Sequence, residues 1–189
     1  MREAKVFSYV VQHDTGHAPN PYFRVSALCS CKYRKSPREP KNVVELAEPG
    51  DWIVGTGGAD LTKSAGHHKL VYAMKVEQKI TRGKYFRRPA LDGKKPSGKE
   101  GGDQSRGENL RPTDQSEDEE QYVLISKKHF YCFGHDAIPT PRDKFSHFEK
   151  KGPGFRSDFD ADYIKRFEKW IRGITQASAA TRASSNPSR

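Results

Sequence analysis

A long polar stretch at residues 87–120 is the feature that most limits how this chain can fold, because it contains almost no apolar residues. Such a segment cannot bury enough surface to offset the conformational entropy lost on ordering, so we predict a disordered insert there. The hydrophobic share of the whole chain is 33%, low for a globular protein, and the insert explains part of that shortage. A folded core must therefore be built from short apolar segments on either side.

Three apolar segments before the insert have the composition of strands. Residues 6–11 are β-branched and aromatic, and residues 52–54 follow a turn signal at Pro49-Gly50-Asp51. Residues 70–80 form the longest predicted strand. Its alternate residues share one apolar face: Leu70, Tyr72, Met74 and Val76.

After the insert we predict either two strands, at residues 122–125 and 130–133, or one bent strand broken near residues 126–128. A helix follows, ending near Gly173, and residues 177–189 are predicted to be a disordered tail. The helix is indicated by apolar residues at spacings of three and four: Phe159, Tyr163, Phe167, Trp170, Ile171 and Ile174.

These elements predict an α+β fold in a single domain at residues 1–176. Residues 43–47 form a short helical turn, and about five or six short strands curve into a small β-barrel closed by the C-terminal amphipathic helix.

The formal net charge of +10 favours a polyanionic partner, and both nucleic acid and acidic membrane surfaces would satisfy it. No apolar run approaches the length of a signal-peptide core or a membrane span. Three cysteines do not form a disulfide scaffold. We therefore expect a cytoplasmic protein that acts away from the membrane.

The loop at residues 18–23 is the most informative candidate site. Two prolines stiffen a segment in which an amide can read a base edge and an aromatic ring can stack on a base. The alternative is a rigid loop whose aromatic residues belong to the core. The candidates in this loop are Pro19, Asn20 and Tyr22.

Further candidates lie on the predicted strands and on a basic loop. Glycines at a strand end let a backbone approach a ligand, although a glycine run is more often a tight turn. The candidate base-binding residues are Trp52, Gly55, Thr56, Gly57, Ser126, His129 and Tyr131. The candidate phosphate-binding residues are Lys32, Arg34 and Lys35, for which an exposed loop is the alternative, together with Lys69.

Neither a metal site nor a catalytic constellation is evident. Cys29 and Cys31 are one residue apart with no second pair, unlike a structural zinc site, and adjacent His67 and His68 would point apart on a strand. We predict no metal and no cofactor. Residues of catalytic type match no known spacing: Asp14, Asp51, His67, Ser126 and His129.

Four motifs in order resemble the nucleotide modification associated domain 2 family. They begin at Phe7-Ser8-Tyr9-Val10-Val11, Pro49-Gly50-Asp51-Trp52, Lys69-Leu70-Val71-Tyr72 and Val123-Leu124-Ile125-Ser126. The resemblance implies an association with enzymes that modify DNA bases, in bacteria and their viruses. More distantly, Gly50-Asp51-Trp52 and the strand that follows it resemble the EVE and ASCH branches of the PUA-like superfamily, which implies a barrel holding a modified or flipped base.

The expected function is a non-catalytic module that binds a nucleotide or modified base, with nucleic acid, DNA in particular, as partner and DNA-modifying enzymes as neighbours. Two alternatives stay open. One is an enzyme acting on a nucleotide or modified base, and the other is an interaction subunit of a modification system.

Overall fold

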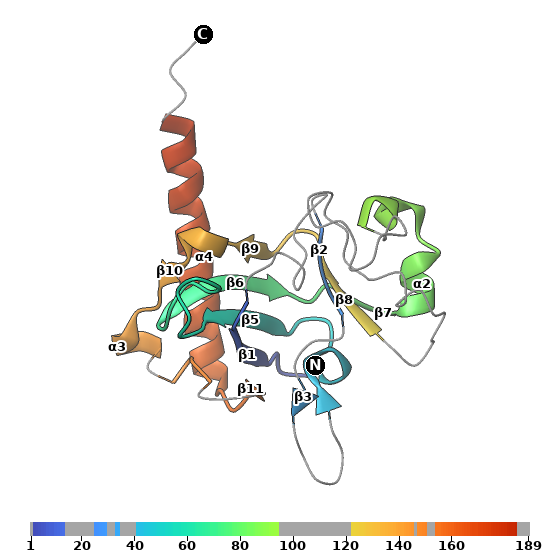
Figure 1. The fold of residues 1–189 in the computed structure, drawn as a ribbon, viewed down its shortest axis with the longest axis horizontal. Coiled ribbons are helices and arrows are strands. Elements are labelled where there is room, and N and C mark those ends of the chain that lie inside the picture. Colours follow the sequence, from blue (N-terminus) through green and yellow to red (C-terminus); the bar gives the residue numbers. More distant parts are fainter. Residues whose placement is uncertain are drawn as a thin grey trace.

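The structure is a computed structural model that describes residues 2–13, 25–29, 33–34, 41–94, 122–145, 147–150 and 154–184. Its folded part has four layers, with helix α4 (Ala161–Ser184) on one side and helix α2 (Arg82–Phe86) on the other. Two β-sheets lie between these helices (Figure 1). The protein is thus a mixed α+β protein with a C-terminal helix, as predicted.

The larger sheet has six strands. Strand β1 pairs in parallel with β5, while the other pairings are antiparallel. The spatial order is β10 (Ile138–Pro139), β6 (Lys69–Lys75), β5 (Trp52–Gly57), β1 (Val6–Val11) and β11 (Phe155–Arg156), and β9 (Phe130–Cys132) also pairs with β6.

The smaller sheet has three antiparallel strands, and a separate pair of two-residue strands lies outside both sheets. The three strands are, in order, β2 (Ser26–Cys29), β8 (Tyr122–Ser126) and β7 (Gln78–Thr81). The separate pair is β3 (Tyr33–Arg34) with β4 (Lys41–Asn42). The described residues therefore contain more strands than predicted. Pairing in two sheets does not establish a closed barrel, and the barrel stays a prediction.

Four α-helices are present in the described residues, more than the sequence predicted. Besides α2 and α4 they are α1 (Val43–Leu46) and α3 (Arg142–Phe145). The predicted helical turn at residues 43–47 is confirmed as α1. This helix begins after Asn42, because Asn42 and Glu45 form a reciprocal capping box there. Short 3-10 helices occur at Pro89–Lys94 and Gly134–Asp136.

Two boundary predictions are wrong. Helix α4 passes Gly173 and continues to Ser184, so residues 177–184 of the predicted tail are helical. Gly173 is exposed with no neighbouring atom against it, and a single helical glycine lowers stability without ending a helix. The polar insert also begins with structure, because the 3-10 helix carries the buried side chain of Leu91. Residues 95–121 lie outside the described part.

The predicted strand at residues 70–80 is divided between the two sheets. Strand β6 ends at Lys75 and β7 begins at Gln78. Between them, Val76 N donates to Asp51 O at 2.8 Å and Glu77 N donates to Ile125 O at 2.9 Å. The backbone thus leaves one sheet and enters the other within two residues, although the apolar alternation continues through the break.

Residues 122–132 cross between the two sheets in the opposite direction, from the smaller sheet to the larger one. Strand β8 lies in the smaller sheet and β9 in the larger one, which confirms two strands. The Glu77 carboxylate accepts hydrogen bonds from Lys128 N at 2.6 Å, His129 N at 3.3 Å and Ser126 Oγ at 3.3 Å. Partial burial raises the pKa of Glu77, but these donors outweigh it and hold the pKa below its usual range.

Three apolar cores fill the spaces between the layers. The first lies between the two sheets and includes Tyr9, Leu28, Met74 and Leu124. The second lies between the larger sheet and α4. All six predicted apolar residues of the C-terminal segment belong to the second core or pack against it: Phe159, Tyr163, Phe167, Trp170, Ile171 and Ile174. The third core lies under α2 and the first 3-10 helix.

Helix α4 is also fixed to the larger sheet by one carboxylate. Glu168 Oε1 accepts from Trp52 Nε1 at 2.8 Å and from Lys75 Nζ at 2.7 Å. Partial burial raises the pKa of Glu168, but the hydrogen bonds from Lys75 and Trp52 outweigh this effect, and the net shift is downward. The charged form is therefore the one that the folded state favours.

We predict that Glu77→Gln lowers the free energy of unfolding at neutral pH by about 1–2 kcal/mol. Hydrogen bonds to a charged group contribute somewhat more than this when fully buried, and the partial exposure of Glu77 reduces their contribution. Because the folded-state pKa of Glu77 is depressed, its stabilisation is complete above the ordinary value of 4.5 and is lost as pH falls through the folded value. Urea denaturation of both proteins at neutral and acid pH measures this.

Glu48→Gln serves as the control, because the Glu48 side chain is half exposed and bonds only Lys79 among the described residues. Glu48→Gln should lower the free energy of unfolding by much less than Glu77→Gln does. A stability difference between wild type and Glu77→Gln that stayed constant into acid would contradict the assigned role.

Candidate functional site

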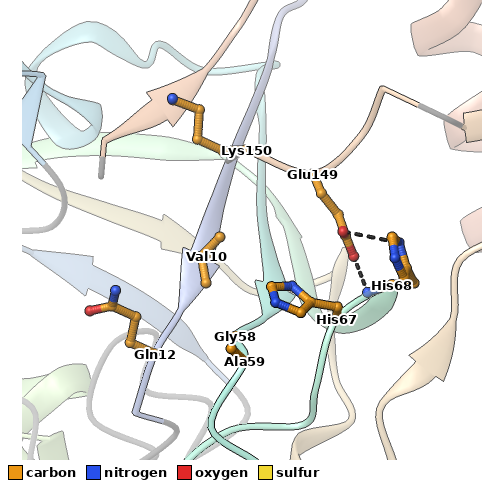
Figure 2. Close-up of a pocket in the computed structure, with 8 residues that line it drawn as sticks. All are labelled: Val10, Gln12, Gly58, Ala59, His67, His68, Glu149 and Lys150. Carbon is orange, nitrogen blue, oxygen red and sulfur yellow. Dashed lines mark hydrogen bonds and ion pairs between the residues drawn. The ribbon is translucent and has the colours of Figure 1, made fainter. Parts of the chain in front are cut away.

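A hollow of about 490 Å³ lies where the parallel strands β1 and β5 end. The paired register of these strands ends at Val11 and Gly57. Four segments line the hollow (Figure 2): Val10 and Gln12, Gly58 and Ala59, His67 and His68, and Glu149 and Lys150. In open sheets, ligands bind at the carboxyl ends of parallel strands, which is the position seen here.

The loop at residues 58–68 forms one wall of the hollow and is closed at its neck by two glycines. A Cβ on Gly57 would overlap the carbonyl oxygen of Gly66, so the two backbones touch and only glycine fits. Ser64 adds a second tie, since its Oγ accepts from Gly58 N at 2.8 Å and donates to the carbonyl of Val11. The wall is thereby fixed to both strand ends.

A second wall is held by Glu149. Its carboxylate accepts the backbone N–H of His68 and pairs with His68 Nδ1 at 3.0 Å, as the dashed lines in Figure 2 show. The carbonyl of His68 in turn accepts from Thr140 N at 2.8 Å. His68 has φ 61°, a left-handed conformation that non-glycine residues adopt only when their surroundings hold it. Strain of this kind concentrates at ligand sites.

The lining is chemically mixed. Val10 and Ala59 supply apolar surface, while Gln12, His67 and Lys150 supply an amide, an imidazole and a positive charge. Gln12 and His67 are exposed. An apolar pocket with a few convergent polar groups is typical of a small-ligand site.

Several predicted site residues lie outside the described part of the chain. They are Pro19, Asn20 and Tyr22 of the proline loop, together with Lys32 and Lys35. Arg34 lies in β3, but its side chain is not among those described. Of the predicted phosphate ligands, Lys69 is placed next to the hollow, because it follows His68 directly at the start of β6.

Trp52 and Tyr131 lie together, away from the hollow. Trp52 is 1% exposed and belongs to the core under α4. Tyr131 stacks on it with ring centroids 6.3 Å apart. Ser126 is buried and His129 is exposed, and both lie at the crossing held by Glu77, at the opposite end of β6 from the hollow.

The predicted glycine-rich strand end adjoins the hollow, and the structure gives its residues packing contacts. A Cβ on Gly55 would overlap the Tyr72 ring, and Thr56 Oγ1 donates to Tyr9 O at 3.2 Å. Asp51 lies at the other end of β5, where its carboxylate accepts from Lys5 N at 2.8 Å and Glu48 N at 2.9 Å. It shapes the turn before the strand, as the sequence indicated.

Sequence reasoning missed most of the lining. Gln12, Ala59, Glu149 and Lys150 were not candidates, and His68 was weighed only as a metal ligand. The available signal was Gly58 together with the His67-His68 pair, which bracket one loop between two strands. Within the described part of the chain no three His, Cys, Asp or Glu side chains cluster as metal ligands would.

The fold and the hollow define an α+β protein with a ligand-sized site at the ends of its parallel strands. A family model for nucleotide modification associated domain 2 matches residues 3–119, more than half of the chain, and the chain belongs to that family. No curated protein and no solved structure matches it. Among the described helices, none is long and apolar enough to cross a membrane.

We predict that Gly57→Ala lowers the free energy of unfolding by about 1–3 kcal/mol or more, because the new methyl group must push the backbone of Gly66 away. Gly58→Ala is the matched control, since its Cβ would meet nothing closer than 3.3 Å. Urea denaturation of the two variants should show a clearly larger loss at Gly57. Equal losses would mean that the neck of the loop is not packed as described.

Proposed function

We propose that this protein binds a nucleotide or modified base in the hollow at the ends of β1 and β5, as a nucleic-acid-associated module of base modification systems. The observation that carries the proposal is the hollow itself, since it combines nucleotide-compatible size with mixed lining at a position where α/β sheets bind ligands. Membership of the nucleotide modification associated domain 2 family supports the same ligand class.

Four of the lining residues have chemistry that suits a nucleotide. The Gln12 amide carries both a donor and an acceptor, which is what reading a base edge requires. Val10 and Ala59 offer apolar surface for a flat ring. Lys150 and the basic surplus of +10 supply positive charge for a phosphate.

The remaining candidates from the sequence complete the proposal. The proline loop with Asn20 and Tyr22 follows Gln12 in the sequence, and Gln12 lines the hollow. Lys32, Arg34, Lys35 and Lys69 would hold phosphates along the nucleic acid. The two sheets packed face to face are compatible with a PUA-like barrel in one domain.

An enzyme acting on the same ligand is the second candidate, and the His68–Glu149 pair favours it. A carboxylate that bonds imidazole Nδ1 orients the ring and leaves Nε2 to exchange a proton, as in general acid–base sites. Incubation with nucleotides, modified and unmodified, followed by product analysis separates the two functions. Turnover that His68→Asn abolishes would establish the enzyme.

We predict that Gln12→Ala weakens binding of the preferred nucleotide by about 2- to 10-fold, the loss of one hydrogen bond. Fluorescence polarisation or calorimetry against oligonucleotides and nucleotides carrying different base modifications identifies that ligand and measures the change. Gln78→Ala is the control, because Gln78 lies in the smaller sheet, where it accepts from Arg88 Nη1. Absence of binding to every ligand at low salt would reject the proposed function.

A further inference from the structure

Leu61, on the loop that walls the hollow, is exposed to an unusual degree. Its relative exposure is 76%, and it is the only large apolar side chain exposed among the described residues. A single exposed leucine is ordinary on a protein surface, so exposure alone identifies nothing. The informative features are its place on the loop whose two ends line the hollow and the hydrogen bonds that hold the turn around it.

The turn around Leu61 is braced on both sides. Asp60 Oδ1 accepts from Thr62 N at 3.0 Å and from Thr62 Oγ1 at 2.6 Å, and Ser64 N donates to Asp60 O at 2.8 Å. These hydrogen bonds, the Thr62 hydroxyl first, hold the pKa of Asp60 below its usual range. The Leu61 side chain leans on Gly66, where a Cβ would meet its Cδ2 at 2.7 Å.

The position of Leu61 ties it to the hollow. Gly58 and Ala59 line the hollow just before it in the chain, and His67 and His68 line it just after. Lys63, two residues on, has a side chain that is 57% exposed and lies 3.5 Å from Asp60 Oδ2. An exposed apolar side chain and an exposed cation thus lie on the loop whose two ends line the hollow, and neither is among the residues of the lining.

We infer that the ligand in the hollow is part of a polynucleotide, and that Leu61 packs against the base next to the bound nucleotide while Lys63 meets the adjoining phosphate. This inference rests on the proposed function. Bases present flat apolar faces once they are unstacked, and nucleic-acid-binding proteins place leucine between or against them. A free nucleotide would not extend past the rim and would not touch Leu61.

The test compares two probes, a labelled mixed-sequence single-stranded DNA oligonucleotide and the common deoxynucleoside 5′-monophosphates. Leu61→Ser should weaken oligonucleotide binding by about 5- to 20-fold, from the lost apolar burial, and leave monophosphate binding unchanged. Leu61→Met keeps the apolar surface and should retain the oligonucleotide affinity. Since Leu61 is exposed, neither variant should change the unfolding midpoint.

Lys63→Gln provides an independent readout. It should reduce the slope of log affinity against log salt by about 0.7, the value for one phosphate contact on a single strand, while Leu61→Ser leaves that slope unchanged. Unchanged oligonucleotide affinity in Leu61→Ser overturns the inference. Equal losses for both probes also overturn it, because Leu61 would then shape the hollow. If wild type binds neither probe, nor any modified-base ligand, the proposed function itself fails.

Discussion

The crossing at Glu77 is the constraint on which the arrangement of the two sheets depends. Two of the passages of the chain between the sheets, one after β6 and one before β9, meet at one carboxylate. Neighbouring backbone bonds reinforce the junction, from Lys75 N to His129 O at 2.8 Å and from Glu77 N to Ile125 O at 2.9 Å. Because both crossings are tied at one corner, the smaller sheet is held face to face with the larger one, and the first core is enclosed between them.

Local patterns predicted the elements that local chemistry determines. The strand at residues 6–11 is β1, the Asn42 and Glu45 pair caps α1, and the three-and-four spacing after residue 159 identifies the apolar face of α4. In each case the residues that decide the structure lie within a few positions of one another. The prediction that the helix ends at Gly173 was wrong, because α4 continues to Ser184. A glycine is only a weak signal for a helix end unless it adopts the left-handed conformation of a cap.

The division at residues 76–77 could not be predicted from periodicity. Val76 continues the apolar alternation of β6, yet its N–H bonds Asp51, and Glu77 bonds Ile125, partners far away in the sequence. A switch between sheets is decided by those distant partners. The hollow was missed for the same reason, because its four lining segments come from residues 10–12, 58–59, 67–68 and 149–150, and only the fold brings them together.

Loop rigidity connects the fold to the site. The hollow is bounded by strand ends, whose positions the sheet fixes, and by irregular segments, which the sheet does not fix. Each irregular wall has its own brace: the Gly57–Gly66 contact and Ser64 on one side, and the bonds from His68 to Glu149 on the other. A preformed site loses less conformational entropy when it binds than one that must order its loops, so these braces would favour binding of the proposed ligand by holding the walls in place.

The residues that stabilise the fold are different from the residues that face the hollow. The residues that hold the sheets and α4 in place, such as Glu77, Glu168 and Tyr72, lie in cores or at crossings. The side chains that face the hollow, such as Gln12 and His67, are exposed and absent from the three apolar cores. Substitutions there would change the chemistry of the hollow at little expense to folding, since surface changes away from packed features alter stability only slightly. Under the proposed function, ligand preference could therefore shift while the framework stays constant, which suits a domain associated with nucleotide modification.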